Sequence, residues 1–95
     1  MGARQGLLAL CGYWLDQKGS AYQLLPGSAH SLHVYTARPS GQRRYTAHLV
    51  RLALKRGQPR VIWGANRYTL CESSLDAITW QGRNKTDHFA WVRIA

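Results

Sequence analysis

The sequence predicts an all-β fold, a small antiparallel meander of about eight short strands that closes as a barrel or packs as a two-sheet sandwich. Turn-forming residues interrupt the chain at short intervals, and the segments between them are rich in Tyr, Trp, Val, Ile, Thr and Leu. A length of 95 residues fits one domain, from residue 1 to residue 95. Four tryptophans and a hydrophobic fraction of 45% exclude a disordered basic tail.

The predicted strands lie between clusters of Gly, Pro, Asn, Asp and Ser. They span residues 8–15, 20–25, 31–37, 44–54, 60–63, 67–71, 77–81 and 88–94. In one break Pro39 precedes Ser40 and Gly41, and its ring presets φ for the first central position of a β-turn. A motif of Trp, loop and aromatic-x-apolar strand begins at Trp14, Trp63 and Trp80. Each unit resembles one hairpin, which favours a meander.

One segment is also compatible with a helix. Four of its basic residues are spaced by four, three and four positions, as on one face of an amphipathic helix. They are Arg44, His48, Arg51 and Lys55. Gly57 and Pro59 follow as a cap and a stop. The alternative fold is therefore α+β with a basic helix at about 43–56, while the strand interpretation rests on the β context around the segment.

The positive charge is concentrated in the middle of the chain. Thirteen Lys and Arg oppose four Asp and Glu, so the formal net charge is +9, and no acid lies between Gln17 and Cys71. The cations of this acid-free segment are Lys18, Arg38, Arg43, Arg44, Arg51, Lys55, Arg56, Arg60 and Arg67. Because cations without counter-charges repel one another in a folded chain, we expect a polyanion to bind here.

The expected partner is nucleic acid, and the aromatic residues between the cations favour RNA or single strands, because their rings can stack on bases. Sequence specificity should be low. The alternative is a non-catalytic interaction or scaffold module, one subunit of a larger assembly, whose basic face docks an acidic protein. A homo-oligomer through an exposed strand edge is also open.

The candidate contacts begin at a turn. Arg38, Arg43 and Arg44 flank Pro39-Ser40-Gly41, and arginines on a loop can hold a phosphate with two parallel hydrogen bonds. The other cations expected to contact nucleic acid are Arg51, Lys55, Arg56, Arg60 and Arg67.

The last predicted strand completes the candidate contacts. By the two-residue period of a strand, Phe89, Trp91 and Arg93 share one face, and small aliphatic residues that suit a core share the other. Two rings and a guanidinium in a row could form a platform for bases, which adds Trp91 and Arg93 to the interface. Large rings fill cores more often than they bind ligands, so burial of this face is the alternative.

No motif indicates catalysis, a metal or a cofactor. The four histidines and two cysteines lack the spacing of a zinc site. A Gly-rich phosphate loop, a nucleophile elbow and paired carboxylates are missing from the sequence. We therefore expect a protein that is not an enzyme.

The apolar run at residues 7–10 is far shorter than the roughly 20 residues of a membrane span, so no membrane is expected. Cys11 and Cys71 have apolar neighbours, and we expect free thiols that pack as small core side chains. Without a targeting signal the expected location is intracellular.

The order Arg38-Pro39-Ser40-Gly41, Arg44-Tyr45-Thr46, Trp63-Gly64, Tyr68-x-Leu70 and Phe89-x-Trp91-x-Arg93 resembles short tryptophan-rich modules of algal, dinoflagellate-type proteins. The resemblance covers about residues 12–93. It implies a strand rather than a helix at 43–57, and it implies no activity.

Overall fold

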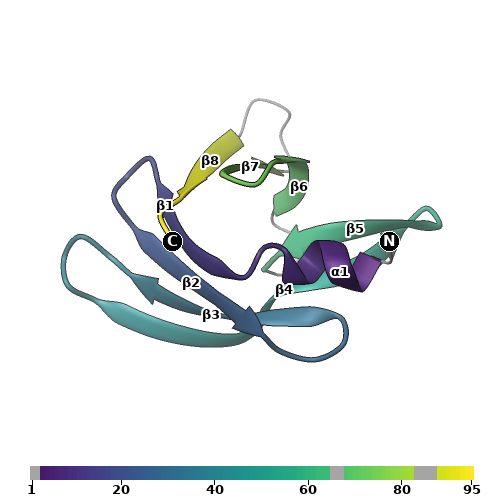
Figure 1. Cartoon of the computed structure of the whole chain (residues 1–95), viewed down its shortest axis with the longest axis horizontal. Helices are drawn as coiled ribbons and strands as arrows, with labels where there is room; N and C mark the ends of the chain where they lie inside the picture. The colour runs from purple at the N-terminus through teal and green to yellow at the C-terminus, as the bar shows by residue number, and fades with distance from the viewer. Residues whose placement is uncertain (1–2, 65–67, 83–87) are drawn as a thin grey trace.

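A computed structural model describes residues 3–64, 68–82 and 88–95. Eight antiparallel strands, joined in sequence order, form one closed barrel that a short helix precedes (Figure 1). The elements are α1 (Ala3–Leu8), β1 (Gly12–Asp16), β2 (Ala21–Pro26), β3 (Ser31–Ala37), β4 (Arg43–Lys55), β5 (Gln58–Trp63), β6 (Tyr68–Ser73), β7 (Ala77–Gly82) and β8 (His88–Arg93). The all-β meander is confirmed, and it closes as a barrel rather than as a sandwich.

The predicted and observed strands correspond one to one. The largest difference is at the first strand, which begins at Gly12 rather than at residue 8, because residues 3–8 are helical. Residue 67, the expected start of the sixth strand, lies outside the described residues. In the described strands β1 pairs with β8, so the ladder is continuous around the ring. Each described strand thus has a neighbour on both sides, and the homo-oligomer through a strand edge stays a prediction.

The helix alternative for residues 43–56 is wrong, because this segment is β4, a strand of 13 residues. It pairs with β3 over residues 43–51 and with β5 over residues 50–55. One residue, His33, separates Leu32 from Val34, whereas three residues separate their partners Val50 and Thr46. The two extra residues form a bulge at which His48 has a left-handed φ of 56°. Because the excess is even, both Thr46 and Val50 face the barrel interior.

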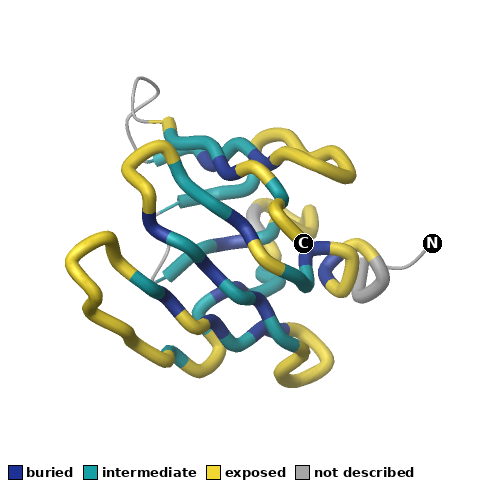
Figure 2. The backbone as a smooth tube through the Cα atoms, turned by 60° about the vertical axis from the view of Figure 1, so that its left-hand side comes forward, coloured by how far each residue is buried: buried dark blue, intermediate teal, exposed yellow. Residues whose placement is uncertain are grey.

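Large rings fill the barrel. The side chains of Trp14, Trp80 and Trp91 are fully buried, and most buried positions lie within the strands while exposed ones gather in the turns (Figure 2). The ring centroid of Trp91 is 4.5 Å from that of Tyr22 and 4.9 Å from that of Trp63. The buried indole N–H groups of Trp80 and Trp91 have no acceptor among the described residues, so these rings contribute through packing.

The residues around α1 close one end of the barrel. Leu7 and Leu10 are buried in the same core cluster as the tryptophans, and the indole N–H of Trp14 donates to the carbonyl of Leu10 at 2.8 Å. Arg93 covers this closed end by donating to the carbonyls of Ala9, Cys11 and Leu75 at 2.8, 2.9 and 2.6 Å. A guanidinium that binds carbonyls after the last turn of a helix stabilises that turn.

Gly12 allows this closure. Its φ is +135°, and a Cβ atom there would lie 2.5 Å from a guanidinium nitrogen of Arg93 and 2.8 Å from the carbonyl oxygen of Ala95. The chain can pass this close to Arg93 only where the residue has no side chain.

The two cysteines are free thiols in different settings. Cys11 is half-buried, and burial raises the pKa of its thiol. Cys71 is exposed, so the prediction that it packs in the core is wrong. In the described ranges, no helix has the length and apolar character needed to cross a membrane.

Replacing Trp91 by Ala should lower the free energy of unfolding by about 3–5 kcal/mol, because it leaves a cavity in the middle of the ring cluster. Urea denaturation followed by far-UV circular dichroism measures the loss. Val92 is adjacent in sequence but 51% exposed, and Val92→Ala should change the stability by no more than about 0.5 kcal/mol. Equal losses in the two variants would contradict the burial of Trp91.

Candidate nucleic-acid interface

Four rings form a continuous strip on the outer face of β3 and β4. In order they are His48, His33, Tyr45 and Tyr35, and we call them the ring strip. Their successive centroids are 4.6, 5.8 and 4.7 Å apart. Tyr35 and Tyr45 are each 48% exposed, and His48 is exposed. Exposed rings in contact are pre-arranged for stacking, because little side-chain freedom remains to be lost on binding.

The bulge in β4 holds the histidine end of the strip in place. The backbone N–H of His48 donates to Nδ1 of His33 at 3.1 Å. Nδ1 of His48 is hydrogen-bonded to the hydroxyl of Ser31, which is buried. The imidazole of His48 is thus tied to the neighbouring strand instead of extending freely into solvent.

The tyrosine end belongs to a longer row across the sheet. Tyr13 is opposite Gln23, Gln23 is opposite Tyr35, and Tyr35 is opposite Tyr45. Partners in register point to the same side of a sheet. Tyr13 is 44% exposed, so the row carries rings from β1 to β4.

Three arginines lie on the same outer face. Arg43 is two residues before Tyr45 on β4, and Arg51 follows Val50, whose side chain points inward. Arg60 precedes Val61, which packs against the core, so it also faces outward. We call the ring strip with these three arginines the basic wall. The strands β2 to β5 contain no Asp or Glu, so the wall has no counter-charge of its own.

The guanidinium groups of the wall are only partly engaged. Arg51 donates to the carbonyl of Gly64 at 2.8 Å, and Arg60 donates to Oε1 of Gln58 at 2.7 Å. Each guanidinium has five N–H donors, so donors remain for a phosphate on both side chains.

The structure separates the other predicted cations from the wall. Arg38 and Arg44 point into a cavity at the open end of the barrel. Arg56 lies in the turn after β4, and a strand of 13 residues can separate that turn from Arg43 by at most roughly 40 Å at ~3.3 Å per residue. Figure 1 shows the turn before β4, next to Arg43, and the turn after β4 on opposite sides of the molecule. The side chain of Lys55 and all of Arg67 lie outside the described residues.

The structure corrects the predicted roles of Trp91 and Arg93 as contacts for nucleic acid. Trp91 is fully buried, so it offers no surface on which a base could stack. The guanidinium of Arg93 binds three carbonyls at the closed end and lies 4.3 Å from the ring of Trp14. The face with the rings is therefore the interior one, while Val92 and Ile94 are 51% and 54% exposed. Inside the barrel, the ring of Trp91 packs with aliphatic side chains such as Leu24, Leu32 and Ile78.

The ring strip was not predicted from the sequence. Alternation within residues 31–37 already places His33 and Tyr35 on one face. The missing information was the register, because a shift of one residue between β3 and β4 would put Tyr45 on the opposite face from Tyr35. The bulge at His48 could not be read from the sequence at all.

No family model, curated protein or solved structure matches this chain. The side chains themselves are therefore the evidence for a function. Across the described residues, no group of three or more His, Cys, Asp or Glu gathers where it could hold a metal ion.

A hydrogen-bond network lies at the open end of the barrel. The hydroxyl of Tyr22 donates to Asp16 at 2.7 Å, and Arg38 donates to the hydroxyls of Ser20 and Tyr22 at 3.0 and 3.3 Å. Asp16 also accepts the backbone N–H groups of Lys18 and Ser20, both at 2.9 Å. Burial, followed by the hydrogen bond to Asp16, raises the pKa of Tyr22 from 10.0 to about 12.

This shift predicts a pH dependence of stability. The folded state favours the neutral phenol, so the contribution of Tyr22 is complete below pH 10 and is lost as the pH rises toward about 12. The difference in urea midpoint between the wild type and Tyr22→Phe should therefore shrink from pH 9 to pH 12. A difference that stays constant over this range would show that the phenol titrates normally in the folded protein.

Proposed function

We propose that this protein binds single-stranded nucleic acid, RNA in particular, along the basic wall and with low sequence specificity. The observation that carries the proposal is the ring strip between Arg43, Arg51 and Arg60 on strands without acids. Arginine donors around exposed rings are the combination that single strands require. A duplex fits less well, because its bases are already stacked and unavailable to the rings.

The rings and the arginines of the basic wall would have different roles. Tyr35 and Tyr45 would stack on bases, and every base has a flat face, so stacking selects single strands without selecting a sequence. The arginines would bind phosphates and set the position of the strand. The proposal needs no bond to be broken, and it assigns the wall to binding alone.

The salt dependence of RNA binding tests the proposed contacts between arginines and phosphates. The affinity for a fluorescein-labelled 12-nucleotide RNA, measured by fluorescence anisotropy between low and physiological salt, should fall with a slope of roughly 0.7 in log K per log salt for each phosphate contact. Replacing Arg43 by Gln should reduce the slope by about that amount. Arg56→Gln removes the same charge from the turn after β4, at the other end of that strand from Arg43, and should reduce the slope less. If no RNA binds at low salt, or if salt has no effect, the proposal fails. Equal effects of the Arg43 and Arg56 variants would indicate diffuse attraction instead of a defined wall.

Removal of the tyrosine rings tests the proposed stacking of bases on Tyr35 and Tyr45. Replacing Tyr35 and Tyr45 together by Leu should weaken binding by at least about tenfold, since stacking contributes about 1–3 kcal/mol per base. The salt slope should stay as in the wild type, because no charge is removed. Tyr35→Phe with Tyr45→Phe keeps both rings and should bind as the wild type does. Full affinity of the Leu variant would remove the rings from the interface.

The second candidate is a non-catalytic interaction module that docks an acidic protein. It is favoured by the side chain of Leu54, which is 74% exposed on β4, the strand that carries Arg43 and Arg51, because protein interfaces combine apolar side chains with a polar rim. A pull-down before and after nuclease treatment separates the candidates. Partners lost after nuclease support the nucleic-acid proposal, and a directly bound acidic protein that survives it supports this one.

A further inference from the structure

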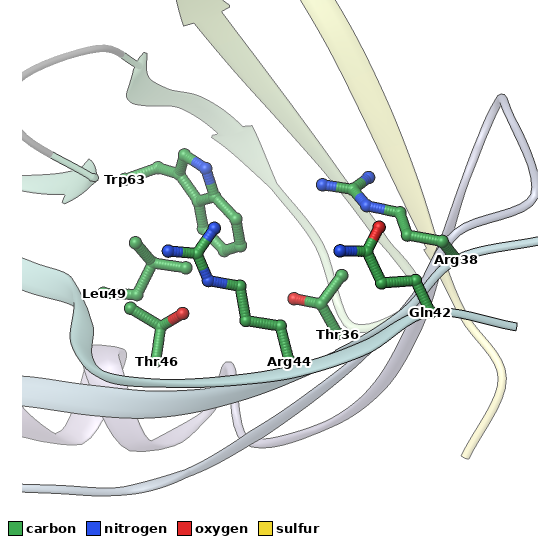
Figure 3. A pocket seen from close by; sticks show the side chains of 7 residues that line it. All are labelled: Thr36, Arg38, Gln42, Arg44, Thr46, Leu49 and Trp63. Carbon is green, nitrogen blue, oxygen red and sulfur yellow. The ribbon is translucent and has the colours of Figure 1, made fainter. Parts of the chain in front are cut away.

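The open end of the barrel contains a cavity that is separate from the basic wall. It has a volume of about 300 Å³, and Thr36, Arg38, Gln42, Arg44, Thr46, Leu49 and Trp63 line it. Figure 3 shows Arg44 extending from β4 toward Trp63, with Arg38 and Gln42 beside it. We call this space the mouth cavity.

The two-residue period of the strands builds the mouth cavity. Arg44 is paired with Thr36, and Thr46 is paired with Val34, so all four side chains point inward. Val34 is part of the apolar core, but the positions nearer the open end are polar. The backbone bonds of the β3–β4 turn, from the N–H of Arg38 to Gln42 at 2.8 Å and from that of Gly41 to Arg38 at 2.9 Å, bring Arg38 and Gln42 over the same space.

The polar groups of the mouth cavity have free hydrogen-bonding capacity. The side chains of Thr36, Gln42, Arg44 and Thr46 have no hydrogen-bond or ion-pair partner among the residues that the structure describes. Thr36 is only 8% exposed. A guanidinium, an amide and two hydroxyls directed into one space are suited to an anionic group with several acceptor oxygens.

A second hollow continues the mouth cavity. Its volume is about 320 Å³, and it shares Arg38 and Trp63 with the first. Tyr68 and Phe89 add aromatic surface to it. Its acid, Asp16, already accepts three hydrogen bonds, so its oxygens are occupied by the protein.

The floor of this space is closed. Trp63 lies 4.9 Å from Trp91 and 5.8 Å from Trp80 between ring centroids, and both of those rings are fully buried. A nucleic-acid strand therefore cannot pass through the barrel. The space can receive a small molecule, and the two hollows together have the volume of an ordinary ligand pocket.

We propose that the mouth cavity binds a small organic anion, with its carboxylate or phosphate group on Arg44 and Arg38 and a flat apolar body against Trp63. The charged end is assigned by the free guanidinium of Arg44 and the hydroxyls beside it. The flat body is assigned by the rings of Trp63, Tyr68 and Phe89. This site and the basic wall occupy different faces of β4, since Arg43 and Arg44 point to opposite sides of the strand.

Isothermal titration calorimetry with three naphthalene compounds tests the proposal. 1-Naphthyl phosphate and 1-naphthoate carry the two anionic groups, and 1-naphthol is the uncharged comparison. We expect at least one anion to bind at least about tenfold more tightly than the naphthol, as a charge-assisted pair of hydrogen bonds provides. Whichever anion binds better identifies the class of natural ligand. Failure of both anions to bind, or naphthol binding as tight as theirs, would overturn the proposal.

Two matched variants locate the binding. Arg44→Gln should weaken binding of the anions by about tenfold or more, and Arg44→Lys should restore part of it, because Lys keeps the charge but not the planar fork. Arg43→Gln removes the same charge from the other face of β4 and should keep the affinity of the wild type for the anions within about twofold. Equal losses in Arg43→Gln and Arg44→Gln would place the anion elsewhere.

The contact with Trp63 is read in the wild-type protein, because Trp63 also packs on the core. Its indole N–H resonance, assigned in a ¹⁵N-labelled sample, should shift on titration with 1-naphthyl phosphate, while that of Trp14 at the closed end should not. An unmoved Trp63 signal would overturn the proposed position. RNA binding to the wall is measured separately, so either proposal can fail while the other holds.

Discussion

The packing of indole rings inside a small closed barrel is the constraint on which the rest of this structure depends. An eight-stranded barrel has an interior just wide enough for side chains, and here Trp14, Trp80 and Trp91 are its largest fully buried side chains, packed among Leu, Val and Ile. A bulky interior needs fewer residues, so 95 are enough for a closed ring of strands. The same packing leaves no room for a central channel. Binding surfaces are thereby confined to the outside and to the open end.

The two ends of the barrel differ in the side chains that lie over them. At the closed end Leu7 and Leu10 enter the core and Arg93 binds the carbonyls around α1. At the open end the inward positions become polar, at Thr36 and Arg44. Arg93 at the closed end therefore holds the fold together, while Arg44 at the open end has no hydrogen-bond or ion-pair partner among the described residues. Identical side chains receive different roles from their positions along the barrel axis.

The bulge in β4 links the fold to the proposed interface. Its two extra residues keep Val50 and Thr46 facing inward, so the core is undisturbed, while His48 is placed over the outer face. A left-handed φ at a non-glycine residue costs free energy, and here the hydrogen bonds to Ser31 and His33 offset it. The bulge thereby brings His48 to the outer face. Strand alternation alone would place only His33, Tyr35 and Tyr45 there.

Turn residues and β-forming segments in the sequence were enough to determine the eight strands, and the acid-free stretch identified the cationic half of the chain. These are local properties, which depend on residue type and spacing. The tertiary structure decided which face of each strand is inside, as for Trp91, and which cations share a surface, as for Arg43 and Arg44. The register of the strands and the closure of the barrel decide these two features. They depend on contacts between residues far apart in the chain, which no local pattern encodes.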